Sequence, residues 1–214
     1  MSLFITFEGI DGCGKSTQLE LFRKYLSDRG IRNMIIREPG GTSIGERIRE
    51  ILLDKINTGM TPETELLLFE ASRAQIVREV IKPEMSSGTV VICDRFADST
   101  TAYQGYGRRI GSESVRMLNE YATDGLKPDI TYLFDIDPVD ASQRMDTRDR
   151  EIDRLDSESR DFIVRVREGY LQIAGEDPGR VRVIDAGKSI EKIAGEIIRI
   201  YEEVSGNETC LRDR

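Results

Sequence analysis

The sequence predicts an α/β fold in which a five-stranded parallel sheet is flanked by helices, and three observations support this prediction. Short apolar segments alternate with segments of helical periodicity along the 214 residues. Several apolar segments are nearly uninterrupted, which is typical of strands covered on both faces. No internal repeat, linker or low-complexity tract divides the chain. Alternating strands and helices favour right-handed crossovers, so we expect one domain over residues 1–204 and a tail over 205–214.

Five segments have the apolar composition of buried strands. They cover residues 3–7, 33–37, 89–93, 130–134 and 181–184.

Helical patterns lie between these strands. Residues 15–28 place Leu19, Phe22 and Leu26 on one helix face. Thr61 and Pro62 provide a cap and a first-turn proline for a helix that is predicted to extend to about residue 85. The other predicted helices cover residues 43–53, 112–123, 139–145, 157–174 and 190–203.

Composition excludes several classes of protein. The formal net charge of -8 argues against a protein that coats nucleic acid, but it permits a small anionic ligand in a cleft. The chain contains no histidine, which excludes a Ser-His-Asp hydrolase and most zinc sites. Catalysis would therefore use Arg, Lys, acids, hydroxyls and backbone groups.

The sequence also bears on location. No apolar run approaches the roughly 20 residues of a membrane span, and the first residues enter a strand without a leader pattern. The three cysteines are widely spaced and lack metal-binding spacing, so we expect reduced thiols. These features predict a cytoplasmic protein with no membrane partner.

The most specific motif follows the first strand. It reads GIDGCGKS and matches G-x-x-x-x-G-K-[ST], in which successive N–H groups surround a β-phosphate. Lys15 would reach the β- and γ-phosphates, and the Ser16 hydroxyl would bind Mg²⁺. A glycine-rich turn with a chance lysine is the alternative, but a strand before and a helix after favour a P-loop and thus the P-loop NTPase fold. The predicted nucleotide-binding residues are Gly9, Ile10, Asp11, Gly12, Cys13, Gly14, Lys15, Ser16 and Thr17.

Two further motifs stand at strand ends. In VVICDRF, Asp94 could hold Mg²⁺ or its water shell and Arg95 would face the cleft, although a surface salt bridge explains this pair equally well. REPGG, residues 37–41, forms a tight and closely approachable loop, but by itself it indicates only a turn.

One helical stretch could recognise a planar base, and a second could form a polar recognition surface. Phe69 and Arg73 share one helix face, where the ring could stack on a base and the guanidinium could bond its edge. The alternative is a core phenylalanine beside a solvated arginine. The segment 98–109 pairs Ser99 with Tyr103 and Thr100 with Gln104 at i, i+4 spacing. The alternative for this segment is an ordinary polar helix and loop.

The segment 142–161 alternates arginines with acids. Such a run is usually a solvated face, but in a phosphoryl-transfer enzyme it can be a lid that brings arginines to the transferred phosphate. We expect a lid over about residues 144–156, with Arg144, Arg148, Arg150 and Arg154.

Taken together, FEGIDGCGKST, REPGGT, LLLFEASRAQ, CDRFADSTTAYQGYGR and DRLDSES resemble the thymidylate kinase family of nucleoside monophosphate kinases. The resemblance covers residues 3 to about 203. The P-loop is generic, whereas EPGG and the DR…AYQG stretch are much more specific. The resemblance implies an enzyme that transfers the γ-phosphoryl group of ATP to dTMP, with Mg²⁺, and a homodimer.

The resemblance also implies roles for the acceptor phosphate and sugar. Asp11 would lie near the 3′-hydroxyl of dTMP, and Arg95, assisted by Arg49, would hold the acceptor phosphate. Tyr103 would disfavour a ribose 2′-hydroxyl.

For the two bases, the resemblance implies that Phe69 stacks on thymine while Arg73 and Gln104 address its polar edge. Ser99 and Thr100 belong to the same acceptor region. Arg144 matches an arginine that packs on adenine.

Members of the family differ in where a catalytic arginine lies. Apart from Lys15, the P-loop here contains no basic residue, so the chain resembles the lid-arginine type, with Arg148 the first candidate and Arg154 and Arg150 next. Cys13 occupies a position where serine or alanine is commoner in the family. Two alternatives stay open: a kinase for dUMP, UMP or AMP, and an ATP-driven switch protein, for which no water-positioning residue is evident.

Overall fold

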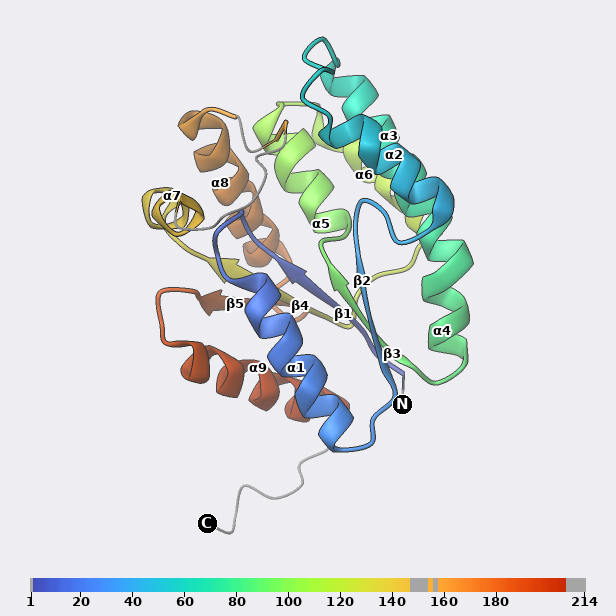
Figure 1. Ribbon diagram of the computed structural model, residues 1–214, viewed down its shortest axis with the longest axis vertical. Helices are drawn as coiled ribbons and strands as arrows, with labels where there is room; N and C mark the ends of the chain where they lie inside the picture. The colour runs from blue at the N-terminus through green and yellow to red at the C-terminus, as the bar shows by residue number, and fades with distance from the viewer. Residues whose placement is uncertain (1, 147–153, 156–157, 207–214) are drawn as a thin grey trace.

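The computed structural model describes residues 2–146, 154–155 and 158–206. Its centre is a five-stranded sheet whose strands all run parallel, in the order β2-β3-β1-β4-β5 (Figure 1). The strands are β1 (Phe4–Glu8), β2 (Asn33–Arg37), β3 (Val90–Asp94), β4 (Ile130–Asp135) and β5 (Val181–Asp185). The predicted parallel α/β fold is therefore confirmed, and each strand lies within one residue of its predicted bounds.

Helices cover both faces of the sheet (Figure 1). They are α1 (Lys15–Asp28), α2 (Ser43–Leu53), α3 (Pro62–Ile76), the π-helical η1 (Val77–Ile81), α4 (Lys82–Ser86), α5 (Ala97–Thr100), the π-helical η2 (Thr101–Gly107), α6 (Ser112–Thr123), α7 (Pro138–Asp146), α8 (Arg160–Glu176) and α9 (Ile190–Ser205). Within the described residues, no helix is long and apolar enough to cross a membrane.

Three helical predictions differ in detail. The helix expected up to about residue 85 changes to π-helix over Val77–Ile81, just before Pro83, whose ring and missing N–H disrupt an ordinary α-helical turn. The helix expected from residue 157 begins at Arg160, because the Ser159 hydroxyl caps it by accepting from the Phe162 N–H. Of residues 98–109, for which a polar recognition surface or an ordinary polar helix and loop were open, those up to Gly107 are helical, and Arg108 and Arg109 follow the helix.

The alternation of β1 side chains explains how the sheet positions a site. Ile5 and Phe7 belong to the core beneath α1 and α9, whereas Phe4 belongs to a second core with η1. By the two-residue period of a strand, Glu8 points to the same side as Phe4. All five residues of β1 are buried, so its carboxyl end is fixed between β3 and β4. Ligands of open parallel sheets bind at such an edge.

Candidate active site

The P-loop joins β1 to α1 through glycines with left-handed backbone. Gly9, Gly12 and Gly14 have φ of 136°, 83° and 97°. A Cβ on Gly12 would stand 2.3 Å from the Ala141 carbonyl oxygen, and one on Gly9 would stand 2.6 Å from that of Phe134. The tight curl that the motif predicted therefore needs glycine, both for its dihedral angles and for its close contact with neighbouring backbone.

Lys15 is buried at the start of α1. Its Nζ donates to the Gly9 carbonyl at 3.0 Å and lies 3.6 Å from the Cys13 sulfur. The ammonium group therefore lies against the loop that would surround a phosphate. Cys13 is buried below it and packs in the main core.

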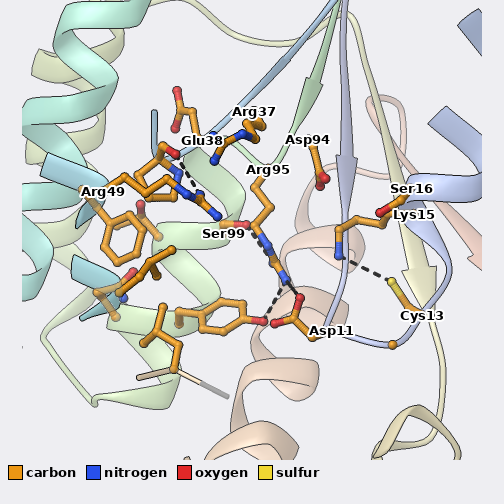
Figure 2. A pocket seen from close by; sticks show the side chains of 18 of the residues that line it. Asp11, Cys13, Lys15, Ser16, Arg37, Glu38, Arg49, Asp94, Arg95 and Ser99 are labelled. Carbon is orange, nitrogen blue, oxygen red and sulfur yellow. Dashed lines mark hydrogen bonds and ion pairs between the residues drawn. The ribbon is translucent and has the colours of Figure 1, made fainter. Parts of the chain in front are cut away.

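One cavity contains the P-loop and most of the predicted acceptor residues (Figure 2). Its walls come from the loop, from the ends of β2 and β3, and from α2, α3, α5 and η2. The lining residues are Asp11, Gly12, Cys13, Gly14, Lys15, Ser16, Arg37, Glu38, Pro39, Arg49, Leu53, Phe69, Asp94, Arg95, Ser99, Thr100, Tyr103, Gln104 and Leu155. Motifs separated by some 90 residues thus meet at the carboxyl edge of the sheet.

Arg95 lies at the centre of this cavity (Figure 2). Its Nη2 donates to Asp11 Oδ1 at 3.0 Å and to the Tyr103 hydroxyl at 3.1 Å. Its Nη1 lies 3.3 Å from Ser99 Oγ and 3.2 Å from the Tyr170 hydroxyl. Its φ is 69°, an uncommon value for a residue other than glycine. The guanidinium is therefore fixed between the P-loop acid and the predicted sugar-contacting tyrosine.

Asp94 and Ser16 fit a magnesium site. Asp94 Oδ1 is buried and has no hydrogen-bond partner among the described residues, although Asp94 lines the same cavity as Ser16. A buried carboxylate oxygen without a partner is costly unless a cation or donor satisfies it. In the described part of the chain no cluster of three or more acidic, histidine or cysteine residues could hold a metal alone. That pattern suits Mg²⁺, which is usually held by one or two protein oxygens together with substrate phosphates and water.

Arg73 lies behind the cavity rather than in its lining. Only 1% of it is exposed, and its guanidinium pairs with Glu38 at 2.7 Å and with Glu70 at 2.6 Å. It also donates to Thr100 and Asn119. Glu38, which lines the cavity, therefore stands between Arg73 and the space where a base would bind. Burial raises the pKa of Glu38 to about 7, although Arg73 opposes the shift.

The predicted base-binding residues Phe69 and Gln104 do line the cavity. Phe69 is half-buried, whereas Gln104 is buried and its amide donates to Glu65 Oε1 at 2.8 Å. Glu65 also pairs with Arg108 at 2.9 Å. Burial would raise the pKa of Glu65, but hydrogen bonds from Arg108, Gln104 and Arg154 hold it below its usual value.

Part of the predicted lid is described. Arg154 pairs with Glu65 at 2.6 Å and donates to the Leu52 carbonyl, which places it beside the end of α2, and Leu155 lines the cavity. Arg148 and Arg150 lie outside the described residues. The lid therefore stays a prediction.

Several predicted nucleotide-binding residues lie outside the cavity lining. Arg144, in α7, donates to the Ala186 carbonyl at 3.0 Å. Thr17 lies on the outer side of α1 beside Leu21, and Ile10 borders a neighbouring pocket with Ala141 of α7. Gly9 is also outside the lining, although its carbonyl contacts Lys15.

Sequence reasoning missed four buried residues around the site. Glu8 and Glu38 end strands or follow them directly, and this position is a signal that could have found them. Glu65, one turn before Phe69, and Tyr170, in α8, have no local motif. Glu65 reaches the site through its contact with Gln104, and Tyr170 reaches it through its contact with Arg95.

Comparison with known proteins identifies the family. The family model described as "Thymidylate kinase" matches residues 7–197. The chain belongs to the thymidylate kinase family. It is 51% identical over 199 residues to a thymidylate kinase of Kosmotoga olearia, covering 93% of this chain and 95% of that protein. It is 47% identical to that of Thermoanaerobacter sp., covering 94% and 97%, and 47% identical to that of Exiguobacterium sp., covering 92% of each.

Membership of the thymidylate kinase family confirms the resemblance that the sequence motifs indicated. The parallel sheet and the P-loop at its central strand agree with the P-loop NTPase fold of a thymidylate kinase.

Proposed function

We propose that this protein is a dTMP kinase, which transfers the γ-phosphoryl group of ATP to dTMP and releases dTDP and ADP for dTTP synthesis. One observation carries the proposal: most of the P-loop and most of the predicted acceptor residues line a single cavity. A donor phosphate at Lys15 and an acceptor phosphate at Arg95 would then meet within that cavity. The family and the names of its relatives support the same reaction.

The chemistry requires alignment and charge neutralisation. The acceptor phosphate oxygen is already nucleophilic at neutral pH, so the reaction needs no general base, which agrees with a chain that has no histidine. Lys15 and Arg95 would neutralise charge on the transferring group and hold it in line. Mg²⁺, which Ser16 and Asp94 would hold, supplies further neutralisation of the phosphate oxygens when bound.

The acceptor nucleoside would lie on the α3 and η2 side of the cavity. Phe69 offers a ring for stacking, and Gln104 offers an amide oriented by Glu65. Tyr103, held by Arg95, would restrict the sugar 2′ position, and Asp11 would meet the 3′-hydroxyl. Arg49, which donates to the Pro39 carbonyl at 2.9 Å, would assist Arg95 on the phosphate.

Arg73 has a different role in this arrangement. Because Glu38 and Glu70 pair with it, it would support the base pocket from behind and reach the thymine edge only through a change in those contacts.

An acceptor panel tests the proposal. Purified protein with ATP and Mg²⁺ is given dTMP, dUMP, UMP or AMP, and ADP formation is followed. Turnover with dTMP well above the others supports dTMP kinase activity, and preference for another nucleotide supports the alternative kinase. Steady ATP consumption without any acceptor would instead favour a switch protein.

We also propose a homodimer, as the family resemblance implied, in the cytoplasm, as the sequence features predicted. Large apolar side chains exposed on α2, α3 and α6 give a candidate contact surface. They are Ile44, Ile51, Leu67, Met117 and Tyr121.

A further inference from the structure

We propose that Glu8 is a positioning residue for the acceptor phosphate, because its carboxylate fixes both the backbone and the guanidinium of Arg95. The proposal rests on the proposed kinase function, and it assigns a role to a residue outside the P-loop and the cavity lining. Glu8 is the last residue of β1 and is fully buried.

The first contact of Glu8 holds the backbone beside Arg95. Glu8 Oε1 accepts the Phe96 N–H at 2.7 Å, and the Arg95 N–H donates to the Phe7 carbonyl at 3.0 Å. These bonds hold the two peptide groups on either side of the Arg95 Cα. The φ of Arg95 is 69°, which is unfavourable for a residue that carries a side chain. Glu8 therefore holds the turn that directs Arg95 into the cavity.

The second oxygen of Glu8 holds the guanidinium indirectly. Oε2 accepts from Ser99 Oγ at 2.5 Å and from the Tyr170 hydroxyl at 2.9 Å. Both hydroxyl oxygens lie within 3.3 Å of Arg95 Nη1. An ionised carboxylate only accepts hydrogen bonds, so both hydroxyls can donate to Glu8, or one can donate to the other across the 2.7 Å between them. In either case lone pairs of the two hydroxyl oxygens stay available to Arg95.

A neutral side chain at position 8 would donate a hydrogen bond at the place where the carboxylate only accepts them. A protonated carboxyl or an amide donates at the Oε2 position, so one hydroxyl must accept from it and then donate elsewhere. The acceptors presented to Arg95 Nη1 become fewer, and the guanidinium loses its fixed direction. Tyr170 belongs to α8, so the same contact also joins Arg95 to the helix that follows the predicted lid.

The protonation state of Glu8 depends on its surroundings. Burial, and next the Asp98 carboxylate, raises the pKa of Glu8 to about 7, while Ser99 and Arg95 oppose the shift. Both the ionised and the neutral forms are therefore accessible near neutral pH. The charged and titratable groups around it are Arg95, Asp98, Tyr170, Arg73, Glu38 and Cys93.

The test compares Glu8→Gln and Tyr170→Phe with wild type in steady-state kinetics for each substrate. We expect Glu8→Gln to raise KM for dTMP by about tenfold, the scale of one lost charge-assisted hydrogen bond, with KM for ATP changed less than about twofold. Tyr170→Phe keeps the buried ring and removes only the hydroxyl. Tyr132→Phe is the matched control, because it removes a buried hydroxyl bond to Ile197 on the far side of β4.

Two readouts separate positioning from loss of folding. The double variant Glu8→Gln, Tyr170→Phe should cost less than the sum of the single effects on kcat/KM for dTMP, since both act through Arg95. The ratio of wild-type to Glu8→Gln kcat/KM for dTMP should rise from pH 6 to pH 8 as Glu8 ionises, because titration of dTMP itself is common to both proteins.

The outcomes test the role of Glu8 separately from the proposed kinase function. A folded Glu8→Gln protein with wild-type KM for dTMP, or equal losses for dTMP and ATP, overturns the role of Glu8. If Glu8→Gln does not fold, Tyr170→Phe with kinetics equal to Tyr132→Phe overturns it. A wild-type protein that does not phosphorylate dTMP overturns the proposed function instead.

Discussion

At the scale of single residues, the base pocket depends on a few side chains whose neighbours decide what they can do. Phe69 is half-buried and lines the cavity, whereas Arg73, one turn further along α3, is locked between two glutamates. The aromatic ring is therefore the directly available contact for a pyrimidine, and the guanidinium acts behind it.

Replacement of Phe69 by alanine should weaken dTMP binding. Base–aromatic stacking is worth ~1–3 kcal/mol in alanine substitutions with single-stranded nucleic acids, so we expect the Kd for dTMP to rise about tenfold or more, with the Kd for ATP nearly unchanged. Isothermal titration with each nucleotide measures this. Retained dTMP affinity together with lost ATP affinity would mean that the two sites are assigned the wrong way round.

At the scale of elements, the P-loop and the lid contribute differently to phosphate binding. The loop is preformed, because its glycines curl against β4 and α7 and the Lys15 ammonium group lies on its carbonyls. Arg154, in the predicted lid, pairs instead with Glu65, so in this arrangement it faces the acceptor side rather than Lys15.

Gly12→Ala should impair ATP binding and destabilise the fold. A Cβ there would stand 2.3 Å from the Ala141 carbonyl, and the φ of 83° is unfavourable for alanine. Gly195→Ala is the matched control, since Gly195 lies in α9 with no atom within 4 Å of an added Cβ. It should stabilise by roughly 0.5–1 kcal/mol. Thermal unfolding and ATP titration of both variants measure this, and equal behaviour would contradict the role of the loop curl.

The lid prediction concerns Arg148, Arg150 and Arg154, each changed singly to lysine, which keeps the charge but loses the planar fork. Replacement of an arginine that acts mainly in the transition state should lower kcat by ~10³-fold, with nucleotide affinity nearly intact. Arg199→Lys, on the exposed face of α9, is the control. Wild-type turnover in all three variants and in the triple variant would mean that Arg95, Arg49 or Mg²⁺ supplies the required charge.

At the scale of the whole molecule, two carboxyl groups buried beside the cavity reduce stability near neutral pH. Glu8 and Glu38 are buried beside the cavity, and burial is the main cause that raises the pKa of each to about 7. The folded protein therefore holds protons that the unfolded chain releases above about pH 4.5. The stability that these groups contribute is complete below about 4.5 and is lost as the pH rises to about 7.

The melting temperature should accordingly fall between pH 5 and pH 7, by several degrees, since about 1 kcal/mol shifts the Tm of a 150–250-residue domain by roughly 2–4 °C. The acids whose pKa is lowered, such as Glu65 and Glu46, titrate below this range and do not mask the effect. Glu8→Gln removes one of the two titrations, so its slope should be smaller. A Tm that rises over this range, with the same slope in the variant, would contradict the argument.

The sequence predicted the strands and the P-loop well because those features are local. A buried parallel strand needs a continuous apolar run, and a phosphate loop needs glycines and a lysine at fixed spacing. The sequence did not predict the contacts that bring Glu8, Tyr170 and Arg95 together, because the tyrosine follows the arginine by 75 residues. Nor did it predict that Arg73 pairs with Glu38. Such buried polar networks depend on which helix packs over which strand end.

The proposed homodimer gives the last prediction. Helix α3 contacts both α2 and α6, so Leu67, 55% exposed on α3, lies among the apolar side chains of the candidate surface. Ile44 and Ile51 of α2 are seven residues apart, and Met117 and Tyr121 of α6 are four apart, so each pair shares one helix face. An exposed apolar surface of this kind in a protein of net charge -8 favours burial against a partner over exposure to water.

Leu67→Glu should therefore convert a dimer into a monomer, because it would place two buried, unpaired carboxylates at a symmetric contact. Ile190→Glu is the control: Ile190 is 51% exposed, but it lies at the start of α9, where an acid suits the helix terminus. Light scattering at several protein concentrations measures the mass of each. If wild type is dimeric and Leu67→Glu keeps the dimer mass, the contact surface lies elsewhere, and if wild type is monomeric the homodimer proposal fails.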